Sequence, residues 1–143
     1  MEVFKTKEQL LATKGVCETA KGLEMDNDDI YVNQLMLDML SGISKKDVED
    51  VICNNVITLR DWMFIDENAY IIKTREEIRE TIGVFLSSAN YYEYYDAEAK
   101  DVSGYVYNDS VEALAGIEIN FPDNEKSVRI GNNTILKWMC KKA

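Results

Sequence analysis

The residues best suited to holding a metal ion form an acidic run at positions 26–29, Asp-Asn-Asp-Asp. An EF-hand calcium loop that began at Asp26 would need glycine at its sixth position and glutamate at its twelfth. Those positions hold Tyr31 and Leu37. The run is therefore predicted to be a solvated acidic loop, and we expect neither a metal ion nor another cofactor.

The residue types needed for nucleophilic catalysis are incomplete. The sequence contains no histidine, so a Ser-His-Asp triad and a Cys-His pair are both excluded. Its cysteines, Cys17, Cys53 and Cys140, are far apart and form no CxxC pair, which argues against a zinc site and a disulfide framework. They are expected to be small, partly buried thiols in a reducing cytosol. Since phosphate-binding glycine motifs and GxSxG are also missing, we predict that the protein is not an enzyme.

Negative charge is concentrated in two segments of the chain. The 143 residues include 26 acidic and 16 basic ones, for a net charge of −10. Residues 18–67 contain 12 acidic and four basic residues, and residues 90–125 contain nine acidic and one basic residue. Segments of this charge steer association toward a basic partner and disfavour binding to nucleic-acid phosphates. The expected partner is a protein with a basic surface, with no direct nucleic-acid binding.

The sharpest local feature is a run that places four tyrosines within residues 91–95. Tyrosine is enriched at binding hot spots because it offers rigid contact area at low entropic cost. A binding role predicts that Tyr92 and Tyr95, or Tyr91 and Tyr94, are exposed, whereas an edge strand with alternate faces is the alternative. The predicted partner-binding residues are Tyr91, Tyr92, Glu93, Tyr94, Tyr95 and Asp96, together with Asp26, Asp28 and Asp29.

The chain also matches itself. Residues 3–16 and 71–84 are identical at six of 14 positions, and residues 31–43 and 105–117 at five of 13. A random pair of segments would match at roughly one position in sixteen. Because the matching blocks occur in the same order, we predict a tandem duplication.

The duplication places a boundary near residue 70. Repeat 1 then spans residues 1–70 and repeat 2 spans residues 71–143, packed together as one compact unit. Both copies close on Trp-Met, which makes Trp62 and Trp138 the predicted core or inter-repeat anchors.

Each copy opens with a short apolar strand, at residues 3–4 or 70–72, that is followed by a threonine suited to capping a helix. A glutamine or glutamate three residues later completes a capping box, and a glycine that can adopt positive φ follows the helix. The residues concerned are, in the two copies, Thr6 and Thr74, Gln9 and Glu77, and Gly15 and Gly83.

The later part of each copy predicts a second helix and then strands. The expected helices are 33–40 and 110–114, with stops at Gly42 and Gly116; the expected strand runs are 48–59, 117–121 and 128–136; and the expected turns are Asn54-Asn55 and Asn132-Asn133. The predicted fold class is α+β, with two tandem homologous repeats that each pack short helices on a small antiparallel sheet or SH3-like barrel.

The order of these features resembles small SH3-like β-barrel modules that are common in bacteriophage and prophage proteins. The matching positions are Met36, Met39, Leu40, Gly42 and Trp62 in the first copy, and Leu114, Gly116 and Trp138 in the second. The resemblance covers the back half of each copy and brings no catalytic residues with it. It implies a phage setting and a binding role.

Together these features predict a non-enzymatic acidic binding protein, phage-encoded, that blocks a basic surface of a host protein such as a defence nuclease. It would act as an anti-CRISPR or anti-restriction type of inhibitor. One alternative is a DNA mimic, and another is a nucleotide-like small-ligand binder that uses an inter-repeat cleft lined by Trp62 and Trp138. No apolar run reaches 18 residues and no signal peptide is evident, so we expect the host cytoplasm and no membrane contact. A homodimer is a further possible oligomeric state.

Overall fold

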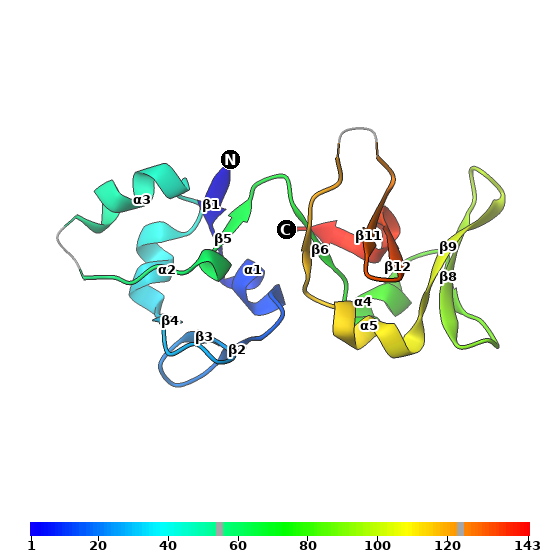
Figure 1. Ribbon diagram of the computed structural model, residues 1–143, viewed down its shortest axis with the longest axis horizontal. Coiled ribbons are helices and arrows are strands. Elements are labelled where there is room, and N and C mark those ends of the chain that lie inside the picture. The colour runs from blue at the N-terminus through cyan, green and yellow to red at the C-terminus, as the bar shows by residue number, and fades with distance from the viewer. Residues whose placement is uncertain (54–55, 123–124) are drawn as a thin grey trace. The chain divides into compact units, whose positions relative to one another are not determined.

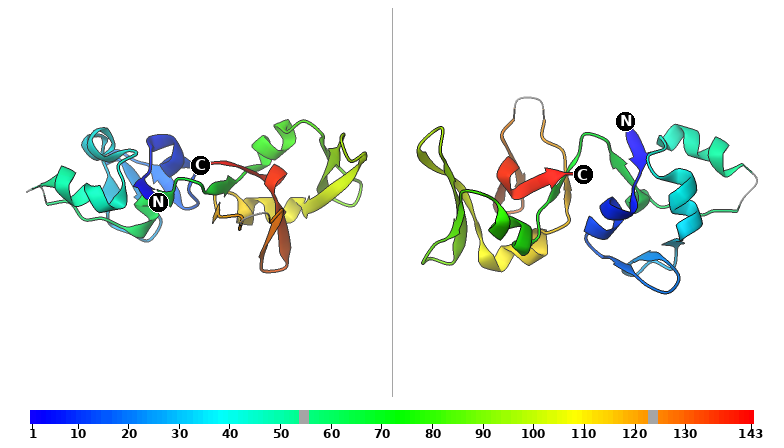
Figure 2. Two further views of the ribbon diagram at one scale, coloured as in Figure 1. Left: turned by 90° about the horizontal axis from the view of Figure 1, so that it is seen from above. Right: turned by 180° about the vertical axis from the view of Figure 1, so that it is seen from behind.

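The computed structural model describes residues 1–53, 56–122 and 125–143 (Figures 1 and 2). The chain divides into two compact units, Met1–Ala69 and Tyr70–Lys142, which we name unit 1 and unit 2. Each unit mixes short helices with small antiparallel sheets, so the α+β class is confirmed. The turn predicted at Asn54-Asn55 lies outside the described residues.

Unit 1 begins with a strand and a capped helix. Its elements are β1 (Glu2–Phe4), α1 (Lys7–Ala12), β2 (Val16–Glu18), β3 (Leu23–Met25), β4 (Tyr31–Val32), α2 (Gln34–Leu40), α3 (Lys45–Ile52), the 3-10 helix η1 (Asp61–Met63) and β5 (Phe64–Asp66). β1 pairs with β5, and β2, β3 and β4 form a three-stranded sheet.

Unit 2 follows a similar order with a longer second sheet. Its elements are β6 (Tyr70–Ile72), α4 (Arg75–Glu80), β7 (Val84–Leu86), β8 (Tyr91–Asp96), β9 (Asp101–Tyr107), α5 (Asn108–Leu114), β10 (Glu118–Ile119), β11 (Ser127–Ile130), β12 (Asn133–Leu136), the 3-10 helix η2 (Lys137–Met139) and β13 (Cys140–Lys142). Its described sheets have the orders β10-β6-β13, β7-β8-β9 and β11-β12. Because the described sheets have only two or three strands each, the SH3-like barrel stays a prediction.

The predicted capping boxes are confirmed in both units. The backbone N–H of Gln9 donates to Thr6 Oγ1 at 3.2 Å, and the Thr6 N–H donates back to Gln9 Oε1 at 3.0 Å. Thr74 and Glu77 make the same two bonds, at 3.3 and 3.0 Å. These bonds satisfy first-turn N–H groups that have no partner inside a helix, which explains why helices of only six residues form here.

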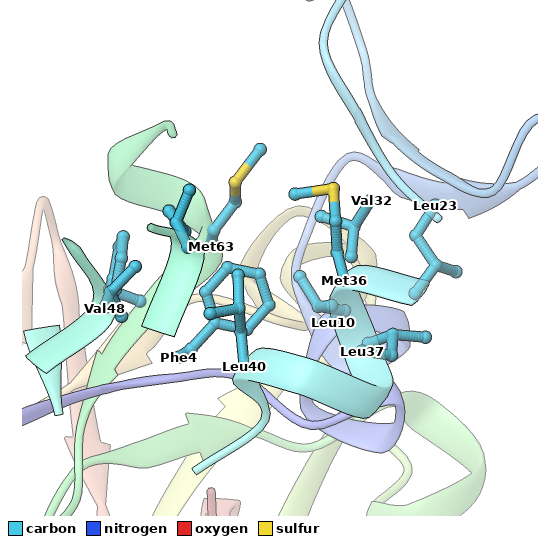
Figure 3. Close-up of a cluster of buried hydrophobic side chains, with 11 residues drawn as sticks. Phe4, Leu10, Leu23, Val32, Met36, Leu37, Leu40, Val48 and Met63 are labelled. Atoms are coloured by element: carbon cyan, nitrogen blue, oxygen red, sulfur yellow. The ribbon is translucent and has the colours of Figure 1, made fainter. Parts of the chain in front are cut away.

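The core of unit 1 gathers side chains from both ends of its sequence. Phe4 of β1, Leu40 of α2, Met63 of η1 and Leu10 of α1 belong to one buried cluster, in which Figure 3 shows Phe4 and Leu40 at the centre. All four are fully buried. Unit 2 has a separate core whose buried members are Ile72, Ile78, Tyr92, Val106, Val111, Leu114, Ile119, Ile135, Met139 and Cys140.

The strand predicted at residues 48–59 is wrong, since its first part is the helix α3. Val48 and Ile52, four residues apart, are buried, while Glu49 and Asp50 between them are exposed. This spacing places the apolar residues on one face of a helix, and it outweighs the strand preference of β-branched residues.

The turn of the β11–β12 hairpin also differs slightly from the prediction. Ile130 pairs with Asn133, so the two turn residues are Gly131 and Asn132, not Asn132 and Asn133. Gly131 has a φ of +58°, which a glycine adopts at low cost. The apolar runs around the turn form strands, as predicted.

The two units place their elements at matching intervals. α1 begins at Lys7 and α4 at Arg75, which is 68 residues later. α2 spans Gln34–Leu40 and α5 spans Asn108–Leu114, a shift of 74 residues at both ends. These shifts equal the offsets between the matching blocks of the sequence.

Removing the cap of α1 should destabilise unit 1. We expect Thr6→Ala to lower the free energy of unfolding by about 1 kcal/mol, because the Gln9 N–H loses its acceptor. Urea denaturation followed by circular dichroism measures this. Thr58→Ala, at an exposed threonine, is the control and should change the free energy much less. Equal losses in the two variants would contradict the capping role.

Candidate functional site

The tyrosine run forms β8, the central strand of the sheet β7-β8-β9. The strand is therefore not at an edge, which corrects the alternative drawn from the sequence. β8 pairs with both neighbours in antiparallel register. Figures 1 and 2 show β8 and β9 as a long twisted ribbon that extends away from α4 and α5 of the same unit.

One face of this sheet belongs to the core of unit 2. Tyr92 is only 2% exposed and lies opposite the buried Val106. Arg79 Nε donates a hydrogen bond of 3.0 Å to the Tyr92 hydroxyl, which gives the buried oxygen a partner. Tyr92 is thus unavailable to a partner protein, and because Tyr91 and Tyr94 are half-buried, neither of the two predicted pairs is exposed as a pair.

Tyr94 is also held inside the unit. Its ring stacks on the indole of Trp138, with 5.6 Å between ring centroids and 18° between planes. The Trp138 Nε1–H donates to the carbonyl oxygen of Ser103 in β9 at 2.8 Å. Tyr95, 45% exposed, is the only tyrosine of the run that the structure places in the exposed class.

The opposite face of the sheet presents a cluster of tyrosines to solvent. Tyr91 lies 4.9 Å from Tyr105 and 5.9 Å from Tyr107, and Tyr105 and Tyr107 lie 5.4 Å apart, between ring centroids. Tyr105 is 51% exposed and Tyr107 is 49% exposed. A hydrogen bond with Tyr105 raises the pKa of the Tyr107 hydroxyl above its usual value, so the Tyr107 hydroxyl is neutral at physiological pH.

The strand register extends this cluster across the sheet. Phe85 of β7 and Tyr105 of β9 both pair with Glu93 of β8, which places the three side chains in one row. Phe85 is exposed and Glu93 is half-buried between its neighbours. We name this surface the aromatic face, and its residues are Phe85, Tyr91, Glu93, Tyr105 and Tyr107.

The aromatic face contains one carboxylate, and further acidic residues follow it in the β8–β9 hairpin. Four carboxylates and one lysine occur between residues 91 and 107. Glu93 lies within the face, while Asp96 accepts hydrogen bonds from the N–H groups of Glu98 and Ala99 and so shapes the turn after β8. The sequence prediction missed Phe85, Tyr105 and Tyr107. The alternation Tyr-Val-Tyr at residues 105–107 is typical of a half-buried strand, and it predicts that Tyr105 and Tyr107 lie on one face.

Lys73 binds the backbone of Trp138, the tryptophan that stacks on Tyr94. Lys73 Nζ donates to Thr81 Oγ1 and to the carbonyl oxygen of Trp138, at 2.9 Å each. Burial lowers the pKa of Lys73 below its usual value, and the nearby Glu77 carboxylate partly opposes this. Since the amine donates to both oxygens, Lys73 joins the end of α4 to the backbone of Trp138.

The three predicted acidic residues of unit 1 have different roles. Asp28 accepts hydrogen bonds from Trp62 Nε1 at 2.9 Å, from Arg60 Nε at 3.2 Å and from the Ile30 N–H at 3.0 Å. These donors, the Trp62 indole first, hold the pKa of Asp28 below its usual 3.8. Asp28 is therefore a structural carboxylate, whereas Asp26 and Asp29 are exposed.

Trp62 and Trp138 are half-buried and pack against the core of their own units. Their predicted role as anchors of the core or between the repeats stays a prediction.

Some site types can be examined directly. In residues 1–53, 56–122 and 125–143, no three histidine, cysteine, aspartate or glutamate side chains gather closely enough to hold a metal ion. Across the same residues, no helix combines the length and apolar character that crossing a bilayer requires. No protein-family model, curated protein or solved structure matches the chain.

The lowered pKa of Asp28 predicts how unit 1 responds to acid. Above about pH 4 the ionised carboxylate accepts all three bonds, and this stabilisation is lost as the pH falls through the lowered pKa. We expect Asp28→Asn to reduce the free energy of unfolding at pH 7 and to flatten its decline below pH 4. Asp29→Asn is the matched control. Equal pH profiles for the two variants, measured by urea denaturation, would refute the assignment.

The cysteines should differ in reactivity. Cys140 is buried and its pKa is raised to about 12, while Cys17 and Cys53 are exposed. Because the thiolate is the reactive form, iodoacetamide at pH 8 should alkylate Cys17 and Cys53 and leave Cys140 unmodified until urea is added. Peptide mass spectrometry reads out each site. Rapid labelling of Cys140 in the folded protein would contradict its burial.

Proposed function

We propose that the protein is a non-enzymatic acidic binding protein whose aromatic face covers a basic surface of a host protein. The observation that carries this proposal is the cluster that the exposed Tyr105 and Tyr107 form with the half-buried Tyr91 beside Glu93. Clusters of solvent-exposed aromatic rings are typical of binding surfaces, because apolar area that stays in water contributes no stability until a partner covers it. Glu93 within the face, with Asp96, Glu98 and Asp101 further along the same hairpin, would select a partner rich in lysine and arginine.

Tyrosine suits this role for two physical reasons. Its ring supplies a large contact area and stacks on guanidinium groups, and its hydroxyl accepts or donates a hydrogen bond at the rim of an interface. The rings on the aromatic face already contact one another, so binding would immobilise few additional side chains. The surrounding negative charge would raise the rate of association with a basic surface.

The proposal includes a tandem duplication of one ancestral module. A buried lysine supports it, because Lys5 Nζ donates to Thr13 Oγ1 at 2.9 Å in unit 1, as Lys73 does to Thr81 in unit 2. Thr13 and Thr81 then donate to the carbonyl oxygens of the residues four positions earlier, at 2.8 Å in each unit. The matching element intervals add to this support.

The setting of the proposal is a phage protein acting in the host cytoplasm against a defence nuclease. It is supported by the acidic charge and by the resemblance to SH3-like phage modules. DNA-binding nucleases carry the basic grooves that an acidic aromatic surface could cover. An inhibitor of this type needs no catalytic residue of its own.

Affinity capture from a bacterial host lysate tests the proposal. The immobilised full chain is compared with the double variant Tyr105→Ser/Tyr107→Ser, which removes two rings and leaves the charge unchanged. We expect a basic protein to be retained by the wild type and bound roughly tenfold or more weakly by the variant, since buried tyrosines are common hot spots. Circular dichroism confirms that the variant is folded.

Ile82→Ser is the matched control, because Ile82 is 93% exposed in the same unit and lies outside the aromatic face. It should retain the partner as the wild type does. Capture of no basic protein at any salt concentration, or equal capture by all three proteins, would overturn the proposal.

A further inference from the structure

Unit 1 has a groove of its own, with a volume of about 420 Å³. The start of α2 forms one wall, and the segments 29–33 and 56–58 form the others. This volume lies within the range of roughly 300–1,000 Å³ that is usual for ligand clefts. The lining residues are Asp29, Ile30, Tyr31, Asn33, Leu35, Met36, Met39, Val56, Ile57 and Thr58.

Most of the residues that line the groove have apolar side chains, and some of these are incompletely covered. Leu35, on the first turn of α2, is 63% exposed, and Tyr31 is 38% exposed. Met36 and Met39 lie on the same helix and pack against the core of unit 1. Methionine side chains are flexible and polarisable, so a groove with a methionine floor adapts to aliphatic groups of different shape.

One of the residues that line the groove is an aspartate that is open to solvent. Asp29 is exposed, and among the described residues no ion pair reaches it. Its neighbour Asp28 differs, since Arg60 and Trp62 already donate to that carboxylate. A cation that approached the groove would therefore meet Asp29 without displacing another cation.

We propose that this groove docks a peptide segment in which a large aliphatic side chain is followed closely by lysine or arginine. The aliphatic side chain enters the groove between Leu35 and Ile57, over Met39. The cation pairs with Asp29 at the lip. A second copy of this chain fits less well, because two molecules that each carry a net charge of −10 repel one another.

This proposal does not rest on the aromatic face, since the groove is built entirely from residues of unit 1. It adds a second recognition chemistry to the chain. The aromatic face offers rings and carboxylates in a sheet, while the groove offers a cavity for one aliphatic anchor. A chain with both could hold two segments of one partner and gain affinity through their linkage.

The test uses a fluorescein-labelled amphipathic peptide of leucine and lysine as the probe, with binding followed by fluorescence anisotropy. We expect Leu35→Ser and Met39→Ser each to weaken binding roughly tenfold by removing apolar contact area. Asp29→Asn should weaken binding several-fold and reduce its salt dependence. Asp26→Asn, the same change at an exposed aspartate that does not line the groove, should have no effect.

Two further comparisons keep the outcomes distinct. A peptide with serine in place of leucine should bind poorly, and Tyr105→Ser/Tyr107→Ser should bind the original probe as the wild type does. Equal affinity of the wild type and Leu35→Ser would overturn the proposal, as would equal binding of the serine peptide. A concentration-dependent dimer that Leu35→Ser abolishes, seen by analytical ultracentrifugation, would show a second copy as the occupant and overturn it too.

Discussion

Both candidate binding surfaces depend on a hydrogen bond from a tryptophan indole. Trp62 donates to Asp28 in the loop before β4, and Trp138 donates to the Ser103 carbonyl in β9. Each tryptophan lies in a 3-10 helix that ends at a methionine, Met63 in unit 1 and Met139 in unit 2. The backbone carbonyl oxygen of that methionine accepts a hydrogen bond of 2.8 Å from the backbone N–H of Lys5 or Lys73, near the start of the same unit. These backbone bonds join the end of each unit to its beginning. The indole bonds then join the end of each unit to the segment in which the two units differ most, the loop that holds Asp28 in unit 1 and the sheet that holds Ser103 in unit 2.

This arrangement explains how one framework could support two different surfaces. The units share the capped helix, a lysine that donates to a threonine eight residues later, and the tryptophan, while the segment that the tryptophan contacts differs in length and composition. In unit 1 the held loop brings Asp29 and Ile30 to the lip of a groove. In unit 2 the sheet β7-β8-β9 directs Tyr92 and Tyr94 toward the core on one face, and it exposes Tyr105 and Tyr107 to solvent on the other.

Features set by neighbouring residues could be predicted from the sequence, and features set by distant contacts could not. Thr6 and Gln9 form a capping box three residues apart, so their pattern was sufficient. Asp28 could not be separated from Asp29, because its partners Arg60 and Trp62 are 32 and 34 residues away. The partial burial of Tyr94 could not be predicted for the same reason, because the ring that stacks on it belongs to Trp138, 44 residues later in the sequence.

The central claim is that each indole N–H holds the variable segment of its own unit, and amide hydrogen exchange of two phenylalanine variants tests it most directly. Trp138→Phe keeps an aromatic ring against Tyr94 but removes the donor to Ser103. The account predicts faster exchange in residues 91–107 of this variant, and faster exchange in residues 26–32 of Trp62→Phe, with little change in the other unit. Unchanged exchange in both variants, or the same uniform increase along the whole chain, would contradict it.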